Sequence, residues 1–410
     1  MDISQRLNAL SEEQRQLLSL RLRERGLPDH LQTPAGDRAT AGRASNTSLR
    51  DDDTSTQAYQ YAGVGEMQFS LFFFSDDGLQ ERDEKYRLLI ESAKFADRHG
   101  FSAIWTPERH FQAIGGLYPN PSVLAAALAM VTERIQIRAG SVVLPLHNPI
   151  RVAEEWSVVD NLSKGRVGVA FASGWHPGDF TLAPGLYHER KEVMFRQIEA
   201  VRKLWAGESI ALEDVDGQAV EVKILPRPIQ PTLPVWITIA GNSESYRKAG
   251  AIGAHVLTGL NGQSLDDLAS KIALYREARE RHGHDPRAGK ITVMLHTFLQ
   301  NTMRAAVEKA REPLTNYLRT FIGQSSTIMA KSSDYRVDGM TEDDREVLVS
   351  YAFENYVQTS SLLGTPDTCA RMIDRLRSIG VNEVACLIDF GLDLDAVLDG
   401  LHYLNELRSA

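Results

Sequence analysis

The chain has 410 residues, of which 43% are hydrophobic and 24% are charged. These are ordinary values for a globular protein, and they exclude wholesale disorder. Lys and Arg together number 45 against 54 Asp and Glu, and the net charge of −9 argues against nucleic acid or an anionic membrane as the main partner. A single domain of this length requires a fold that runs large, and the (β/α)8 barrel is the commonest such fold.

Cysteine content and hydropathy exclude further classes of protein. The two cysteines, Cys369 and Cys386, are too few for a disulfide framework, and they form no cluster for zinc, so we expect no metal site. The N-terminus lacks the apolar core of a signal peptide, and no stretch reaches about 18 apolar residues. We therefore expect a soluble, cytoplasmic protein with no membrane and no nucleic acid among its partners.

The first 65 residues differ in composition from the rest of the chain. Residues 1–28 predict an amphipathic helix, with leucines at near-helical spacing and Gly26–Pro28 as its end. Residues 29–65 contain hardly a large apolar side chain, so they cannot bury enough surface to offset their ordering entropy, and we expect a flexible linker. The helix is either a plain extension or a docking element, because a leucine-rich face requires a partner.

Residues 66–410 alternate buried apolar runs with helical patterns. Eight runs predict strands, at 67–74, 101–107, 135–145, 166–174, 235–241, 254–259, 291–299 and 383–389. The clearest helical patterns lie at 83–99, 121–131, 151–162, 189–205 and 243–250. Eight buried strands, each followed by a helix, predict a (β/α)8 TIM barrel. The competing doubly wound open sheet lacks its usual mark, because no G-x-G-x-x-G follows the first strand.

Two segments are longer than the connections between strands in a simple barrel. Residues 209–232, with a VDGQ turn, predict an inserted hairpin and loop. Residues 323–362 are too long for a simple connection between the seventh and eighth strands. We interpret them as a mobile lid that includes an extra helix at 343–357.

The active site of a barrel lies at the carboxyl ends of its strands. The second strand ends in TPERHF, which places Glu108, Arg109 and His110 at the mouth. A single buried histidine is usually structural, but a barrel core would reject three consecutive ionisable residues. We therefore predict that these three residues are catalytic.

The turn after the fifth strand has the composition of an anion site. Gly241 would let the backbone approach a ligand, and Asn242 and Ser245 begin a helix whose N-terminus could bind a phosphate. The alternative is an ordinary helix cap without a ligand.

Small residues at two other strand ends leave room for a flat ring. Gly140 and Ser141 end the third strand, and Ala172 and Ser173 end the fourth. Simple packing is the alternative explanation. Larger side chains at the mouth could line the rest of the pocket and contact substrate, namely Trp105, His147, Asn148 and Trp175. A wide, flat pocket with a phosphate site at one side would fit flavin mononucleotide (FMN).

Several ordered motifs now match a known family. WTPERHF, GGLYPNPSV and GSVVLPLHNPIRVAEEWSVVDNLSKGRVGVAFASGW resemble the bacterial luciferase-like flavin monooxygenases, and most of all the subgroup in or beside nonribosomal peptide and polyketide synthases. The similarity covers roughly 67–300 and extends through LLGTPDTCARMI at 362–373. It implies a (β/α)8 barrel that takes reduced FMN from a separate flavin reductase, uses O2 as co-substrate and forms a homodimer.

The resemblance also implies roles for the cofactor residues. Gly241, Asn242 and Ser245 match the phosphate-binding turn of the family. Gly140–Ser141 match the position of a non-prolyl cis peptide under the flavin ring. Ala172 and Ser173 match positions beside that ring.

Two positions depart from the luciferase pattern. Ser173 stands where luciferase has a phosphate-binding arginine, and Arg190 is our candidate substitute. Arg109 stands where luciferase has its catalytic histidine. Since arginine cannot act as a base near neutral pH, Arg109 would hold a peroxide anion or a substrate anion, and His110 would transfer protons.

The sequence thus predicts a monooxygenase, dependent on reduced FMN and O2, that acts on an acyl or aminoacyl intermediate of secondary-metabolite biosynthesis. The substrate would be free or tethered to a carrier protein of a synthase module, and the reaction would be hydroxylation or oxygen insertion. One alternative is a deazaflavin-dependent oxidoreductase of the same superfamily. The other is a non-catalytic flavin-binding or synthase scaffold protein.

Overall fold

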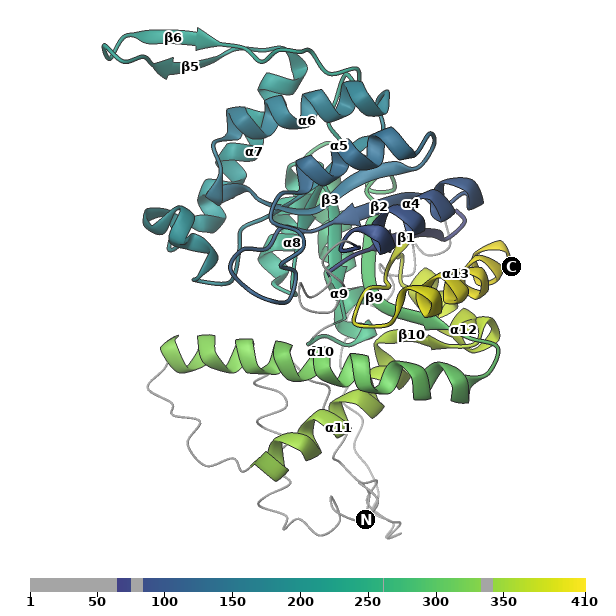
Figure 1. The fold of residues 1–410 in the computed structure, drawn as a ribbon. Helices are drawn as coiled ribbons and strands as arrows, with labels where there is room; N and C mark the ends of the chain where they lie inside the picture. Colours follow the sequence, from purple (N-terminus) through teal and green to yellow (C-terminus); the bar gives the residue numbers. More distant parts are fainter. Residues whose placement is uncertain (1–64, 75–83, 261, 333–341) are drawn as a thin grey trace, which may run out of the picture.

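The computed structural model describes residues 65–74, 84–260, 262–332 and 342–410 (Figure 1). Within them, eight parallel strands close into a barrel that helices surround, which confirms the predicted (β/α)8 TIM barrel. Around the ring the order is β9, β11, β1, β2, β3, β4, β7, β8, and pairing of β8 with β9 closes it. The barrel strands are β1 Gln68–Phe72, β2 Ala103–Thr106, β3 Gln136–Val143, β4 Val167–Ala172, β7 Val235–Thr238, β8 His255–Gly259, β9 Ile291–Leu299 and β11 Glu383–Leu387.

The helices pack around the outside of the strands, as the sequence pattern predicted. They are α4 Arg87–His99, α5 Pro121–Val131, α6 Pro149–Ser163, α7 Arg190–Ala206, α8 Ser243–Ala251, α9 Leu265–Arg281, α12 Pro366–Ser378 and α13 Leu394–Ser409. Local chemistry defines several of their ends. The side chain of Asn120 accepts hydrogen bonds from the first backbone amides of α5, and Pro121 supplies the preset first residue. Gly100 adopts a left-handed conformation directly after α4.

The predicted hairpin is present as two antiparallel strands, β5 Ile210–Glu213 and β6 Ala219–Val222. It projects away from the barrel (Figure 1). The predicted lid differs in its details from the sequence expectation. Residues 323–332 continue the long helix α10 Met303–Ser332 rather than form a loop. The expected extra helix is present as α11 Glu342–Thr359.

One strand was missed by the sequence pattern. The short strand β10 Ser361–Gly364 follows α11 and pairs with β9 beyond the point where β8 ends. Three expectations lie outside the described residues: the helix at 1–28, the linker at 29–64 and the segment 333–341 of the lid. In the described part of the chain, no helix is both long and apolar enough to span a membrane.

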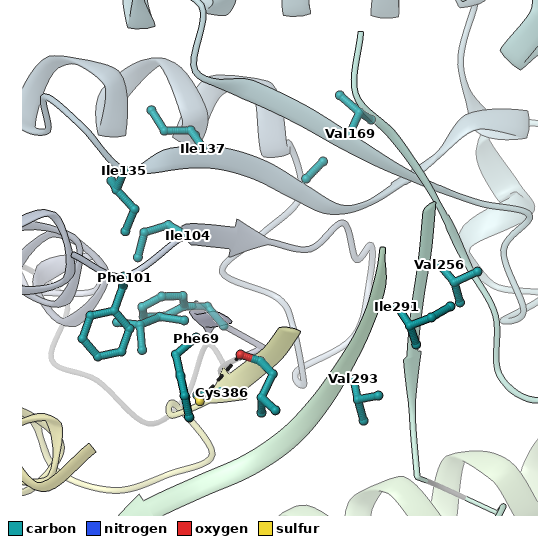
Figure 2. Packing of buried hydrophobic residues seen from close by; sticks show 14 of the residues in the cluster. Phe69, Phe101, Ile104, Ile135, Ile137, Val169, Val256, Ile291, Val293 and Cys386 are labelled. Carbon is teal, nitrogen blue, oxygen red and sulfur yellow. Dashed lines mark hydrogen bonds between the residues drawn. The ribbon is translucent and has the colours of Figure 1, made fainter. Parts of the chain in front are cut away.

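The main core lies between the strands and the surrounding helices. Apolar side chains from alternate strand positions, such as Ile104, Ile137 and Val169, point outward into it (Figure 2). A smaller apolar cluster fills the inside of the barrel: Phe72, Ala103, Trp105, Ala170, Trp236, Leu257, Ala385 and Leu387. Because both faces of each strand are covered, the strands are apolar along most of their length.

An ion pair lies inside the barrel among these aromatic side chains. The Arg138 guanidinium on β3 donates to both carboxylate oxygens of Glu383 on β11, at 2.9 and 2.8 Å. It also stacks on the rings of Trp105 and Trp236, at 4.8 and 4.4 Å from their centroids. Burial alone would raise the pKa of Glu383, but the positive charge and hydrogen bonds of Arg138 lower it, so the carboxylate stays ionised.

We expect Arg138→Met to destabilise the fold by about 3–5 kcal/mol, because it leaves the Glu383 charge buried without a partner. The midpoint of urea unfolding measures this loss. The control is Arg304→Met, which breaks an exposed pair with Glu308 and should change stability by less than about 1 kcal/mol. Adding Glu383→Leu to Arg138→Met should restore much of the stability. Equal midpoints for the two single variants would contradict a structural role for the pair.

Candidate active site

The carboxylate of Glu108, directly beyond β2, joins three segments at the mouth of the barrel. Its Oε2 accepts a 2.7 Å hydrogen bond from the backbone N–H of Val143. Its Oε1 lies 2.8 Å from Nε2 of His110 and 2.6 Å from Nε2 of His147. An ionised carboxylate can only accept, so both imidazoles carry a proton on Nε2. The structure therefore brings two of the predicted catalytic residues together, with the predicted substrate residue His147 beside them.

These contacts shift the pKa values of the acid and one of its histidines in opposite directions. Burial would raise the pKa of Glu108, but hydrogen bonds from His110 and His147 hold it below its usual range. Burial would lower the pKa of His147, but the hydrogen bond and charge of Glu108 raise it. The pair therefore stabilises the fold most between the two pKa values. The contribution of Glu108 is lost as the pH falls through its pKa, and that of His147 as the pH rises through its own.

Arg109 is buried and points to an acidic partner. Its Nη1 donates a 2.8 Å hydrogen bond to Oδ2 of Asp179, at the start of the short helix η2 Asp179–Leu182. The guanidinium also lies 5.0 Å from the ring centroid of Trp175, which is 44% exposed. Burial lowers the pKa of Arg109, although Asp179 opposes this effect. This pairing favours a role in positioning the loop after β4 over the predicted role of holding a peroxide or substrate anion.

The backbone at the end of β3 is flat and closely packed. The peptide bond between Gly140 and Ser141 is cis, as the resemblance implied. A Cβ atom on Gly140 would lie only 2.6 Å from the Phe72 ring, so a larger residue does not fit there. Ser141 Oγ shares a 2.6 Å hydrogen bond with Oγ1 of Thr238, the last residue of β7. Together with Ala172 at the end of β4, these residues keep side chains small along this part of the mouth.

Arg190 lies next to the loop that contains Ser173. Its Nε donates to the carbonyl oxygen of Gly174 at 3.1 Å, and its Nη1 donates to that of Tyr187 at 2.7 Å. Its guanidinium lies 4.4 Å from the Tyr187 ring centroid. Arg190 therefore holds a positive charge against Gly174, the residue that follows Ser173 in the chain.

The N-terminus of α8 combines a capped helix with a nearby lysine. Asn242 Oδ1 accepts from the backbone N–H and the hydroxyl of Ser245, at 3.0 and 3.3 Å, so the Asn242 amide oxygen is used within the cap. Gly241 has a φ of 132°, which only glycine adopts without strain. A Cβ there would lie 3.5 Å from Nζ of Lys271, which donates to Gln263 at 2.8 Å. The helix end and the ammonium group together favour an anion at Gly241.

Two predicted substrate residues have structural contacts in this chain. Trp105 has no exposed surface, because it packs between Arg138 and Trp236 and donates to Ser70 Oγ at 2.9 Å. Its contact with substrate stays a prediction. Asn148 is the N-cap of α6, where its Oδ1 accepts from the Ile150 amide at 2.9 Å.

The sequence analysis missed Asp179 and Lys271. Asp179 lies 70 residues from Arg109 in the chain, and Lys271 lies on a helix, α9, for which we predicted no bounds. No motif spacing connects either residue to its partner. The only available signal was the location of Asp179 in the segment that follows the fourth predicted strand.

Comparisons with known proteins agree with this geometry. The family model described as luciferase-like monooxygenase matches residues 67–383. The oxygenase component of the flavin-dependent trigonelline monooxygenase of Acinetobacter baylyi is 25% identical over 356 residues, which cover 84% of this chain and 95% of that protein.

Two solved structures share the fold. A monooxygenase from Streptomyces bottropensis has a TM-score of 0.67 and 22% identity, and the match covers 83% of this chain and 98% of that one. The oxygenating constituent of 3,6-diketocamphane monooxygenase from Pseudomonas putida, in complex with FMN, has a TM-score of 0.63 and 22% identity. That match covers 83% and 96% of the two chains.

We expect the pKa of His147 to fall in the Glu108→Gln variant, because the negative charge that raises it is removed. Titration of the histidine ring resonances by NMR measures this change. The matched control is Glu199→Gln, which neutralises an exposed carboxylate on α7 that pairs with Lys203. An unchanged His147 titration in Glu108→Gln would contradict the assigned coupling.

Proposed function

Because the chain belongs to the luciferase-like monooxygenase family and is a flavin-dependent oxidoreductase, we propose that reduced FMN is its cofactor and O2 its co-substrate. The observation that carries this proposal is the start of α8, where Gly241 lies beside the Lys271 ammonium group. A phosphate there would receive the helix dipole, backbone amides of the first turn and an ammonium group. Arg190, which contacts the loop after β4, is our candidate for a second cation that would bind the same group.

The end of β3 and the end of β4 suit the flavin ring. Gly140, Ser141 and Ala172 present backbone and short side chains, which leave space for a flat heterocycle at the mouth. When bound, the reduced flavin supplies the electrons that activate O2. The side chains of this protein bind and orient the cofactor and exclude water from it.

Glu108, His110 and His147 would manage protons at this site. His110 is mostly buried and donates its Nε2 proton to Glu108, so its ring is held in one orientation. Glu108 receives hydrogen bonds from both histidines, which lets a proton leave one imidazole while the carboxylate keeps the other in place. We assign proton transfer to His110 and a supporting role to His147.

The organic substrate would be an acyl or aminoacyl chain, hydroxylated or modified by oxygen insertion in the biosynthesis of a secondary metabolite. The resemblance to the synthase-associated subgroup supports this proposal, and it makes a carrier protein or synthase module the partner. Residues 1–28 are the proposed docking element, and the lid, including α11, would cover the tethered chain. Comparing turnover of a carrier-bound acyl chain with that of the same free acid tests the tethering.

A flavin reductase would be the second partner. The relative from Acinetobacter baylyi is named as an oxygenase component, which supports a separate source of reduced flavin here. We also propose a cytoplasmic location. The two cysteines are buried and free, which is compatible with a reducing compartment.

We also infer a homodimer through α5 and α6. These helices pack together, and each exposes apolar side chains at helical spacing: Val123 and Met130 on α5, Val158 and Leu162 on α6. Such neighbouring stripes favour burial against a second copy. Light scattering should give twice the chain mass for the wild type and a single chain mass for the variant that combines Met130→Glu with Val158→Glu. A monomeric wild type would refute the dimer.

We expect Lys271→Met to weaken binding of reduced FMN about tenfold or more, because a charge-assisted contact to the phosphate is lost. Anaerobic titration with photoreduced FMN, followed by flavin fluorescence, measures the affinity. Reduced riboflavin lacks the phosphate, so its binding should change little. Lys248→Met, which removes an exposed lysine near the other end of α8, is the control.

Equal losses for reduced FMN and reduced riboflavin would contradict the phosphate assignment. Binding of a deazaflavin in place of reduced FMN would support the alternative oxidoreductase. If the wild type binds reduced FMN but leaves the rate of its reoxidation by O2 unchanged, the monooxygenase proposal fails in favour of a flavin-binding scaffold.

A further inference from the structure

A buried histidine, His296, lies inside the barrel at the mouth. Two residues earlier on β9, Met294 packs against the inner apolar cluster, and Thr292 accepts a 3.2 Å hydrogen bond from the indole of the interior Trp236. Alternate side chains of a strand share a face, so His296 also points inward. Its register partner on β11 is Leu387, the last residue of that strand. His296 therefore stands one layer above Met294, at the end of the barrel that holds the site.

One nitrogen of His296 has a partner and the other does not. Nδ1 lies 2.8 Å from the hydroxyl oxygen of Tyr356 on α11. Nε2 is buried and has no hydrogen-bond partner among the described residues. A buried polar atom without a partner is costly, and native proteins usually keep one only where a ligand or water completes it. None of the roles assigned above uses this atom.

The protonation state of the ring follows from its surroundings. Burial lowers the pKa of His296 to about 3, so the imidazole is neutral and has one donor and one acceptor nitrogen. Burial raises the pKa of Tyr356, so its phenol keeps the proton and can donate it to Nδ1. With Tyr356 as the donor, Nε2 carries the hydrogen, and a neutral N–H donor is left over among the rings of Tyr317, Tyr356 and Phe390.

The burial of this donor selects what it can bind. Tyr317 on α10 packs against the imidazole with ring centroids 4.6 Å apart. Burial raises the pKa of Tyr317; the Asp389 carboxylate adds to this effect and the Arg109 guanidinium opposes it, so charges of both signs act on this side of the mouth. Asp389 itself accepts from the Phe74 amide at 2.6 Å and from the Tyr118 hydroxyl at 2.7 Å. A carboxylate ligand would lose its hydration in exchange for a single neutral donor, whereas a neutral carbonyl oxygen would lose far less.

We propose that Nε2–H of His296 donates a hydrogen bond to a neutral carbonyl oxygen of the organic substrate, which binds under α10 and α11 after displacing the Tyr317 ring. The substrate class is thus a ketone, aldehyde, ester or thioester rather than a free carboxylate. This assignment rests on the proposed monooxygenase function, which supplies the reason for an organic substrate at the mouth.

The test is NMR of the full chain with ¹⁵N-labelled histidine, without flavin, and with cyclohexanone as the probe. We expect Nε2 of His296 to be the protonated nitrogen and its resonance to shift on addition of the ketone. His255 is a control in the same spectrum, because burial also lowers its pKa to about 3 and it lies at the start of β8, away from the mouth. Cyclohexane and cyclohexanecarboxylate should not produce the shift.

Variants separate a substrate contact from a structural role. His296→Phe should weaken cyclohexanone binding about tenfold and leave cyclohexane binding unchanged. His296→Gln keeps an N–H donor and should retain most of the affinity. Tyr356→Phe removes the hydroxyl that orients the ring and should give an intermediate loss. Reduced FMN should bind all three variants like the wild type, which also shows that they are folded.

Two results would overturn the proposal. One is an unprotonated Nε2 in the wild type, and the other is a ketone that leaves the His296 resonance unmoved. Neither result depends on flavin binding, so they are distinguishable from a failure of the proposed function, in which reduced FMN would not bind the wild type.

Discussion

The buried ion pair between Arg138 and Glu383 determines which end of this barrel can be functional. It crosses the interior from β3 to β11, and two tryptophan rings pack on the guanidinium. Together with the inner apolar cluster, this arrangement fills the interior of the barrel. The two buried charges are tolerated there because Arg138 and Glu383 pair with each other. Space for a ligand is therefore confined to the carboxyl ends of the strands.

At the mouth of the barrel, the polar groups of the candidate active site connect segments of the chain to one another. Glu108 connects the loop after β2 with the segment after β3 through two histidines. Arg109, the next residue, connects the same loop with η2 through Asp179. Glu108 and Arg109 thus fix the loop after β2 to two different segments, which positions His110 at the mouth. A substitution at either residue would act partly through these contacts.

Helices α10 and α11 bring a second set of polar side chains to the same end. Tyr317 on α10 and Tyr356 on α11 both contact His296 on β9. This set differs from the Glu108 cluster, since aromatic rings surround its imidazole and burial keeps that imidazole neutral. The mouth therefore has one side with a carboxylate between two histidines and another side with a neutral histidine among aromatic rings.

The sequence by itself determined the barrel, because eight apolar runs with helical patterns between them have few other ways to bury their surface. It also identified the residues at the strand ends, including Glu108, Gly140 and Gly241, since chain order fixes which residues follow each strand. Tertiary structure decided how those residues pair. Asp179, Lys271 and His296 acquire their neighbours at the site only in the folded chain, which also buries Trp105 completely, and no local pattern encodes either result.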